Sequence, residues 1–259
     1  MVFFQMVPYV FAETDPSLLS QINQLKNGQE QTQARLAGLL EKSLNSYETL
    51  RDYSAIFYKE ERSEKKLGAK EKIFMKFEKP FKIFMKWLDT SKEGVQVLYE
   101  RGRHRNKLVV HKPGLFLGLA PIVFLDQNSP WVKEGSASYN IEDAGLGTFL
   151  LDYARDVLKA LKEKKLQINF PDQKLSEGGD TVEVVFAGSD KTSGYMAYRI
   201  VTFFDQNTHF PTRMRLFDWD NEPMGNYSYE ELKLNAGPEE AAFKSQIQRQ
   251  LYKLYNNIE

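Results

Sequence analysis

The sequence predicts an α+β fold, an incomplete antiparallel β-barrel made of a curved meander sheet, with a long N-terminal helix and with helices and a loop covering its concave face. Three observations support this prediction. A long segment near the N-terminus has apolar residues at helical spacing, many later segments alternate with a period of two, and turn residues separate most of them. Consecutive hairpins with few crossover helices are typical of an antiparallel meander.

The alternation is clearest in residues 72–88, where apolar residues occupy every second position on both sides of Pro80. Proline cannot donate a ladder hydrogen bond, so we expect Pro80 at the connection between two strands. The predicted inner side of the two strands carries Ile73, Met75, Phe77, Phe81, Ile83, Met85 and Trp87. The predicted outer side carries Lys72, Lys76, Lys82 and Lys86.

Apolar stripes at helical spacing predict a short helix over residues 17–25, a longer one over residues 33–52 and another over residues 147–164. Pro238, followed by two glutamates, is a favourable helix start and predicts a C-terminal helix to about Tyr255.

The remaining expected strands are residues 53–63, 95–99, 107–112, 181–187, 195–204, 212–219 and 225–234. Gly102 lies in the hairpin between 95–99 and 107–112, and Asp-, Asn- and Gly-rich turns separate the last four strands. The apolar segment Gly114–Leu125 is interrupted by Gly and Pro. It is expected to be a lid over the sheet, a patch that touches a membrane, or a part of the core.

Composition excludes several classes of function. The formal net charge of zero argues against nucleic-acid binding, and the absence of cysteine excludes disulfides, thiolate metal sites and cysteine nucleophiles. His104 and His111 are separated by an odd number of positions on one expected strand, so they would face opposite sides and could not share a metal. No nucleophile elbow or phosphate-binding glycine loop is present. We therefore expect no catalytic residues, no metal, no cofactor and no enzymatic activity.

The N-terminal residues 2–12 form an apolar run about as long as the core of a signal peptide, with small residues at Val10 and Ala12. Residues 1–12 are therefore expected to be a signal-peptide remnant, and residues 13–259 a single exported, soluble domain, because no linker divides them. The usual basic leader is missing, which leaves open a start further upstream. A short buried segment or an anchor is the alternative interpretation of the run.

The order of these elements resembles the LolA/LolB-like superfamily of periplasmic lipoprotein carriers, and within it the exported bacterial family called domain of unknown function 1571. The stretches that carry the resemblance are Phe77–Leu88, Gly94–Gly102, Tyr139–Gly147, Phe210–Thr212 and Asn226–Asn235. The resemblance implies a half-barrel whose hydrophobic cavity holds acyl chains. It also implies a lid held shut by an arginine before the hairpin proline, where this sequence has Lys79. Lysine lacks the planar donor fork of arginine, so the resemblance alone does not establish the same latch at Lys79.

These observations favour a periplasmic carrier for acyl-chain ligands or lipidated proteins, with transient membrane contact and a monomeric state. A structural or sensory domain with a self-filled core is the alternative. The expected cavity residues are Met75, Phe77, Phe81, Ile83, Met85, Trp87, Val97, Tyr99, Val184, Phe186, Met196, Tyr198, Met214 and Leu216. The candidate lid residues are Lys79, Leu115, Phe116, Leu119 and Phe124.

Overall fold

The computed structural model describes residues 16–28, 30–63, 66–89, 92–113, 122–129, 141–171 and 178–237. The chain forms two compact units. Unit 1 combines the N-terminal residues up to Thr49 with Leu146–Gly225, and unit 2 combines Leu50–Gly145 with the residues from Asn226 onward.

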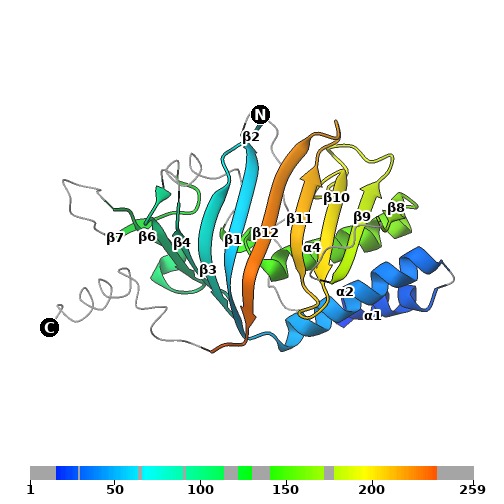
Figure 1. Cartoon of the computed structure of the whole chain (residues 1–259), viewed down its shortest axis with the longest axis horizontal. Coiled ribbons are helices and arrows are strands. Elements are labelled where there is room, and N and C mark those ends of the chain that lie inside the picture. The colour runs from blue at the N-terminus through cyan, green and yellow to red at the C-terminus, as the bar shows by residue number, and fades with distance from the viewer. Residues whose placement is uncertain are drawn as a thin grey trace. The chain divides into compact units, whose positions relative to one another are not determined.

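The sheet is antiparallel, open and twelve-stranded (Figure 1), with the strand order β7-β6-β5-β4-β3-β1-β12-β11-β10-β9-β8 and with β2 paired to β1. Together with the helices, this confirms the predicted α+β class and the incomplete barrel. Strand β12, Pro223–Leu234, begins in unit 1 and continues into unit 2.

Unit 1 contains α1 (Pro16–Lys26), α2 (Gln31–Thr49), α4 (Leu146–Lys162), β8 (Leu166–Asn169), β9 (Gly179–Phe186), β10 (Arg199–Asp205) and β11 (Pro211–Phe217). Helix α4 packs against β8 and β11 and also contacts α1 and α2. Its apolar stripe explains this position, because Leu150, Tyr153 and Ala154 lie on one helical face and are fully buried. The Tyr153 ring lies 6.4 Å from the Phe204 ring of β10.

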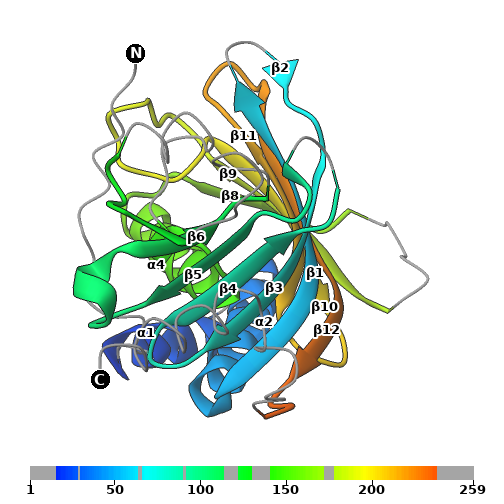
Figure 2. The same cartoon turned by 90° about the vertical axis from the view of Figure 1, so that its left-hand side faces the viewer.

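Unit 2 contains β1 (Asp52–Ser63), β2 (Lys66–Leu67), β3 (Glu71–Glu78), β4 (Lys82–Trp87), β5 (Gln96–Glu100), β6 (Leu108–His111) and β7 (Ile122–Leu125). Two short 3-10 helices, η2 (His104–Asn106) and η3 (Ile141–Asp143), belong to the same unit. Strands β3, β4, β5 and β6 are neighbours in that order, as Figure 2 shows.

Within the described residues, the expected helices over 17–25, 33–52 and 147–164 and most expected strands occur close to their predicted bounds, but some elements were wrong or missed. Strands β2, β7 and β8 were not predicted, and β10 begins at Arg199 rather than at residue 195. The last part of the expected lid segment is thus strand β7, because Ile122–Leu125 pairs with β6. The expected C-terminal helix and residues 1–12 lie outside the described residues.

The predicted sides of β3 and β4 are confirmed by the register, in which Met75 pairs with Met85 and Lys76 pairs with Phe84. The lysines of the outer side differ in exposure. Lys86 is exposed, but Lys76 is only 4% exposed although it lies on the outer side. Its ammonium group donates a hydrogen bond to the carbonyl oxygen of Gly237, 3.4 Å away, which explains how a lysine is accommodated there.

Candidate functional site

The candidate site is one side of the sheet in unit 2, which we call the Met75 face. Cross-strand pairing places Ala55 of β1, Met75 of β3, Met85 of β4 and Val97 of β5 in one row. Residues two positions apart on each strand share the same side. On β1, β3, β4 and β5 the face comprises Tyr53, Ala55, Phe57, Ile73, Met75, Phe77, Ile83, Met85, Trp87, Val97 and Tyr99, and the row continues to Val110 of β6 and Val123 of β7.

The side chains at the centre of the Met75 face are buried from solvent, and some of the others are half-buried. Met75 and Ile83 are 0% exposed and Met85 is 6% exposed. Trp87 at the end of β4 and Val97 of β5 are half-buried. The expected cavity residues of β3, β4 and β5 therefore form one continuous apolar surface.

An aromatic row crosses this surface. The Phe77 ring lies 5.3 Å from Tyr53 and 5.5 Å from Phe81, and the Phe81 ring lies 5.9 Å from Tyr99. The Tyr53 hydroxyl donates a hydrogen bond to the Met75 sulfur at 3.6 Å. Offset and edge-on ring pairs of this kind favour fixed ring positions, so this part of the face is shaped by rigid side chains.

A polar cluster closes the face at the Tyr99 end. The Tyr99 hydroxyl donates to Oε1 of Glu142 at 2.5 Å, and Nε of Arg101 donates to the same oxygen at 3.0 Å. Burial, followed by the Glu142 carboxylate, raises the pKa of Tyr99 to about 12, so the phenol stays protonated at neutral pH. The Arg101 guanidinium also lies 4.9 Å from the centre of the Phe81 ring.

A second polar cluster lies at the Trp87 end. Glu71 accepts hydrogen bonds from the Trp87 indole at 2.9 Å and from the Lys92 ammonium at 2.6 Å, and Lys59 lies 3.7 Å away. Burial pulls the pKa of Glu71 upward, but the hydrogen bonds from Lys92 and Trp87 and the charge of Lys59 outweigh it, so the pKa falls below its usual value. The apolar face thus runs between two charged ends.

Sequence analysis missed three aromatic residues of this region, Tyr53, Phe57 and Tyr229. Phe57 lies 4.7 Å from Tyr229, ring to ring, and Tyr53 lies 6.4 Å from the same ring. Burial, and then the neighbouring tyrosines, raises the pKa of Tyr229 well above its ordinary value. The signal was present in the sequence, because aromatic residues alternate in both β1 and β12.

The other expected cavity residues lie in unit 1. Val184 and Phe186 of β9 and Met214 and Leu216 of β11 are all buried, on strands of the sheet against which α4 packs. Met196 and Tyr198 precede β10 and are only half-buried, whereas the intervening Ala197 and the preceding Tyr195 are buried. Tyr195 stacks on Phe186 with ring centres 4.6 Å apart.

The lid candidates lie in different parts of the structure. Lys79 is half-buried at the β3–β4 connection, where its N–H donates to the Arg51 carbonyl at 2.8 Å. Phe124 cannot be a lid over the Met75 face, since it pairs with Val109 and so lies on the opposite side of the sheet. Leu115, Phe116 and Leu119 lie outside the described residues.

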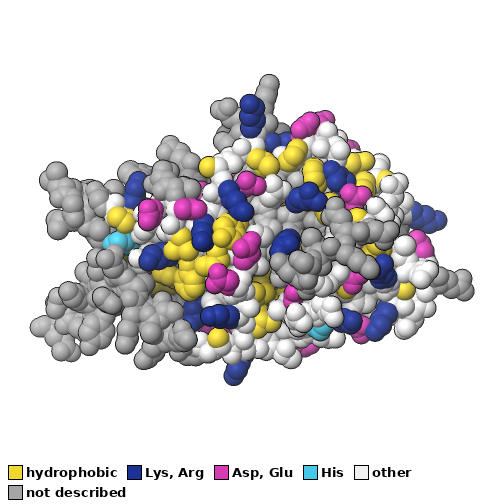
Figure 3. All heavy atoms as spheres, viewed as in Figure 1, with side chains coloured by type: hydrophobic (Ala, Val, Ile, Leu, Met, Phe, Trp, Pro, Cys, Tyr) yellow, Lys and Arg dark blue, Asp and Glu magenta, His cyan; other side chains and the backbone are white. Residues whose placement is uncertain are grey.

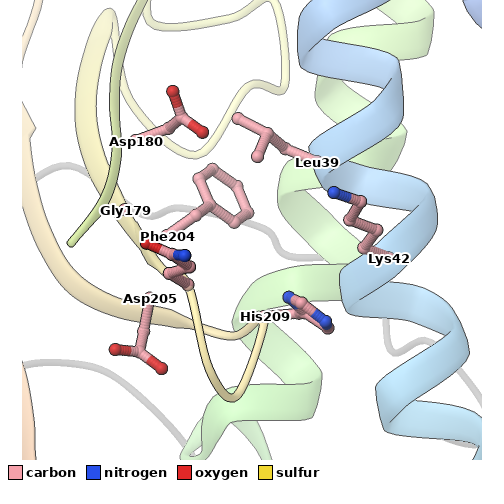
Figure 4. Close-up of a pocket in the computed structure, with 8 residues that line it drawn as sticks. Leu39, Lys42, Gly179, Asp180, Phe204, Asp205 and His209 are labelled. Carbon is pink, nitrogen blue, oxygen red and sulfur yellow. The ribbon is translucent and has the colours of Figure 1, made fainter.

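Unit 1 contains a separate pocket of about 380 Å³ between α2 and the ends of β9 and β10 (Figure 4). Leu39 and Lys42 of α2 line one side, and Asp180, Phe204 and His209 line the other. The lining mixes charged and apolar groups, and the Asp180 carboxylate is paired with Arg35. This pocket suits a small polar molecule better than an acyl chain.

Two further features concern metals and membranes. In the described parts of the chain, histidine, aspartate and glutamate side chains do not gather in a group of three that could bind a metal ion. Within the same residues, none of the helices is both long and apolar enough to cross a membrane.

The chain belongs to a family described as protein of unknown function DUF1571, which matches residues 50–252. This is the family that the sequence resembles. Curated proteins gave no match.

Solved structures give remote similarities, and they include the carrier superfamily that the sequence resembles. A LolA superfamily protein of Nitrosomonas europaea is 9% identical, with 78% of this chain and 94% of that chain covered and a TM-score of 0.35. The lipoprotein LppX of Mycobacterium tuberculosis is 12% identical, with 86% and 95% covered and a TM-score of 0.40. MucB in a complex with MucA from Pseudomonas aeruginosa is 10% identical, with 88% and 60% covered and a TM-score of 0.40.

Proposed function

We propose that the Met75 face of unit 2 binds an acyl chain of a lipid or a lipidated protein, and that the protein is a periplasmic carrier or binding protein for such ligands. One observation carries this proposal. In the described part of unit 2 the helical elements are single 3-10 turns, so the Met75 face has no amphipathic helix of its own there. Unit 1 differs, because α4 packs on its strands.

The energy of burial supports an acyl ligand. Each buried methylene contributes about 0.8 kcal/mol, so a chain of about fourteen carbons gains roughly 11 kcal/mol before the costs of binding. Those costs remove a large part of the gain, and micromolar affinity requires about 8 kcal/mol net. Most of the chain must therefore be enclosed. The flexible Met75 and Met85 side chains can adapt to such a ligand by changing rotamer.

The two polar clusters fit an amphipathic ligand. Arg101 and Glu142 lie at one end of the face, and Lys92 and Glu71 at the other. A headgroup that leaves the apolar surface at either end meets charged side chains rather than more apolar surface, so a ligand with one polar end is favoured over a fully apolar one.

The cellular location belongs to the same proposal. The apolar run at residues 2–12 supports export to the periplasm and a mature chain of residues 13–259 that acts as one monomeric domain with transient membrane contact. N-terminal sequencing of the protein from a periplasmic fraction should find Glu13 first. An intact N-terminus in the cytosol would contradict export.

Titration with a fluorescent fatty acid tests the ligand. Wild-type protein should show saturable uptake with micromolar affinity, and Met85→Glu should abolish it, because a carboxylate would face the acyl chain. Lys86→Glu is the matched control: it introduces the same side chain one position further on, on the opposite side of the sheet, and should bind like wild type. Met85→Gln separates the effect of charge from that of polarity.

A self-filled domain with a structural or sensory role is the second candidate, and one observation favours it. Met75, Ile83 and Tyr99 are already at most 1% exposed without any ligand. If no acyl probe shows saturable uptake by wild-type protein, this second function replaces the first.

A further inference from the structure

The opposite side of the same strands is also apolar, and we call it the Phe84 face. Phe84, Leu98 and Val109 form a buried cluster on neighbouring strands, with Phe74 and Ile122 packed against it. Cross-strand pairs connect Phe84 to Leu98 and Leu98 to Val109, so these side chains share one side. A sheet with two apolar sides needs a second covering layer.

The burial of this cluster indicates that a layer is present. Phe84 and Leu98 are each 3% exposed and Val109 is 0% exposed. Yet the described elements in substantial contact with β4, β5 and β6 are the adjacent strands and the short η2 turn. At the margin, Phe124 is 39% exposed. In Figure 3, hydrophobic side chains also gather over the region where Figure 1 draws β3 and β1.

Polar atoms on this face lack partners. Gln96 and His111 are paired across β5 and β6, and they are only 6% and 2% exposed. Within the described parts of the chain, the Gln96 side-chain oxygen and Nδ1 of His111 have no hydrogen-bond partner. Buried polar atoms are normally satisfied, so the layer over this face should offer hydrogen-bonding side chains as well as apolar ones.

The chain leaving β12 is fixed at this face. Asn235 N–H donates to the Asp52 carbonyl at 2.8 Å, and Gly237 N–H donates to the Asp52 carboxylate at 3.1 Å. The Gly237 carbonyl accepts from the Lys76 ammonium at 3.4 Å. Because Lys76 pairs with Phe84 and shares its side, Gly237 lies at the Phe84 face.

The sequence after Gly237 has the required pattern. Phe243, Ile247, Leu251 and Leu254 recur at spacings of four, four and three, which places them on one stripe of a helix, and glutamines flank that stripe. Seventeen helical residues from Glu239 to Tyr255 span about 25 Å, since each residue rises about 1.5 Å. The four strand spacings from β3 to β7 amount to roughly 19 Å. The charges also agree, because Glu239 and Glu240 follow directly after the Lys76 contact.

We propose that residues 239–255 form an amphipathic helix that lies across the Phe84 face and covers it, with the stripe Phe243, Ile247, Leu251 and Leu254 against the sheet. The Phe84 face is then an internal docking surface occupied by the chain's own C-terminal segment. It is distinct from the Met75 face and does not depend on ligand binding there.

Paramagnetic relaxation enhancement tests this proposal in the full chain. The absence of cysteine allows a single nitroxide label at Lys86→Cys, which is exposed on the Phe84 face. Amide signals of residues 243–254 should be broadened at least twofold. A label at Arg215→Cys, exposed on β11 of unit 1, is the control for nonspecific broadening.

Two further variants make the test specific. Leu251→Lys places a charge in the stripe and should abolish the broadening, whereas Ser245→Lys adds the same charge on the opposite side of the helix and should preserve it. The proposal is overturned if the broadened signals belong to residues 115–120 or 131–140, or if no signals are broadened. Broadening between a labelled and an unlabelled copy in a mixed sample would show a second molecule as the occupant and would also overturn it.

Discussion

The strands of the two units show the same alternation of apolar residues, but the elements that cover their apolar sides differ. In unit 1, α4 packs on β8 and on β11, which carries the buried Met214, so that face is the core of the unit. In the described part of unit 2, the helical elements are short 3-10 turns, and charged clusters lie at the two ends of the Met75 face. The alternation in a strand therefore tells which residues share a side, but not whether a helix, a loop or a ligand covers them.

Equivalent methionine substitutions should give the largest difference between the units. Met214→Glu places a carboxylate under α4 and should lower the free energy of unfolding by about 3–5 kcal/mol, as expected for an uncompensated buried charge. Met85→Glu should lower the free energy of unfolding by only about 1–3 kcal/mol, because a face that binds a ligand can also be reached by water. Urea denaturation of both variants measures the difference.

The outcome distinguishes an open face from a filled one. If Met85→Glu destabilises the protein as strongly as Met214→Glu, the Met75 face is a core like that of unit 1, and the acyl-binding proposal loses its support.

The packing of α4 on α2 should give the next largest effect. A Cβ at Gly147 would lie 2.2 Å from the buried Tyr47 ring, so Gly147→Ala should destabilise the protein by about 1–3 kcal/mol through overpacking. Gly38→Ala in α2 is the control, because nothing lies within 4 Å of its Cβ. That change should stabilise the helix by up to about 1 kcal/mol. A loss of acyl uptake in folded Gly147→Ala protein would show that the two units are coupled.

The sequence predicted the sides of the strands better than their surroundings. The Met75–Met85 pairing follows from alternation, because side-chain direction in a strand is a local property. Phe124 is a lid candidate in the sequence because its apolar segment is interrupted by Gly and Pro, and only pairing with β6 shows it to be in a strand. The packing of α4 on β8 and β11 could not be predicted, since residues far apart in sequence decide which helix covers which strands.

The pH dependence of unit 1 provides a smaller test. Burial, with the charge of Asp152 adding to it, raises the pKa of Asp156 from 3.8 to about 7, despite a hydrogen bond from the Met196 N–H and the nearby Lys159 charge. The folded state thus keeps this proton at a pH where the unfolded state has lost it, so stability should fall as pH rises from about 4 to 7. Asp156→Asn should remove this fall and stabilise the protein by about 1–3 kcal/mol at pH 8.

Thermal melts at pH 5 and pH 8 measure the effect. The wild-type melting temperature should decrease by more than that of Asp156→Asn between the two conditions. Parallel decreases in both proteins would show that Asp156 is not the group responsible.

Glu71 of unit 2 should show the smallest effect, and the opposite sign. Its pKa lies below the ordinary 4.5, because Lys92, Trp87 and Lys59 favour the charged form more than burial opposes it. The resulting stability is present above about pH 4.5 and is lost as the pH falls through the lower, folded-state pKa. Glu71→Gln should therefore lower the free energy of unfolding by about 0.5–1 kcal/mol at pH 7 and by almost nothing at pH 3.

Urea denaturation at pH 7 and pH 3 measures this difference, with the exposed Glu93→Gln as control. A cost that is equal at both pH values would mean that Glu71 acts through packing, and that the charged cluster does not hold the Trp87 end of the Met75 face.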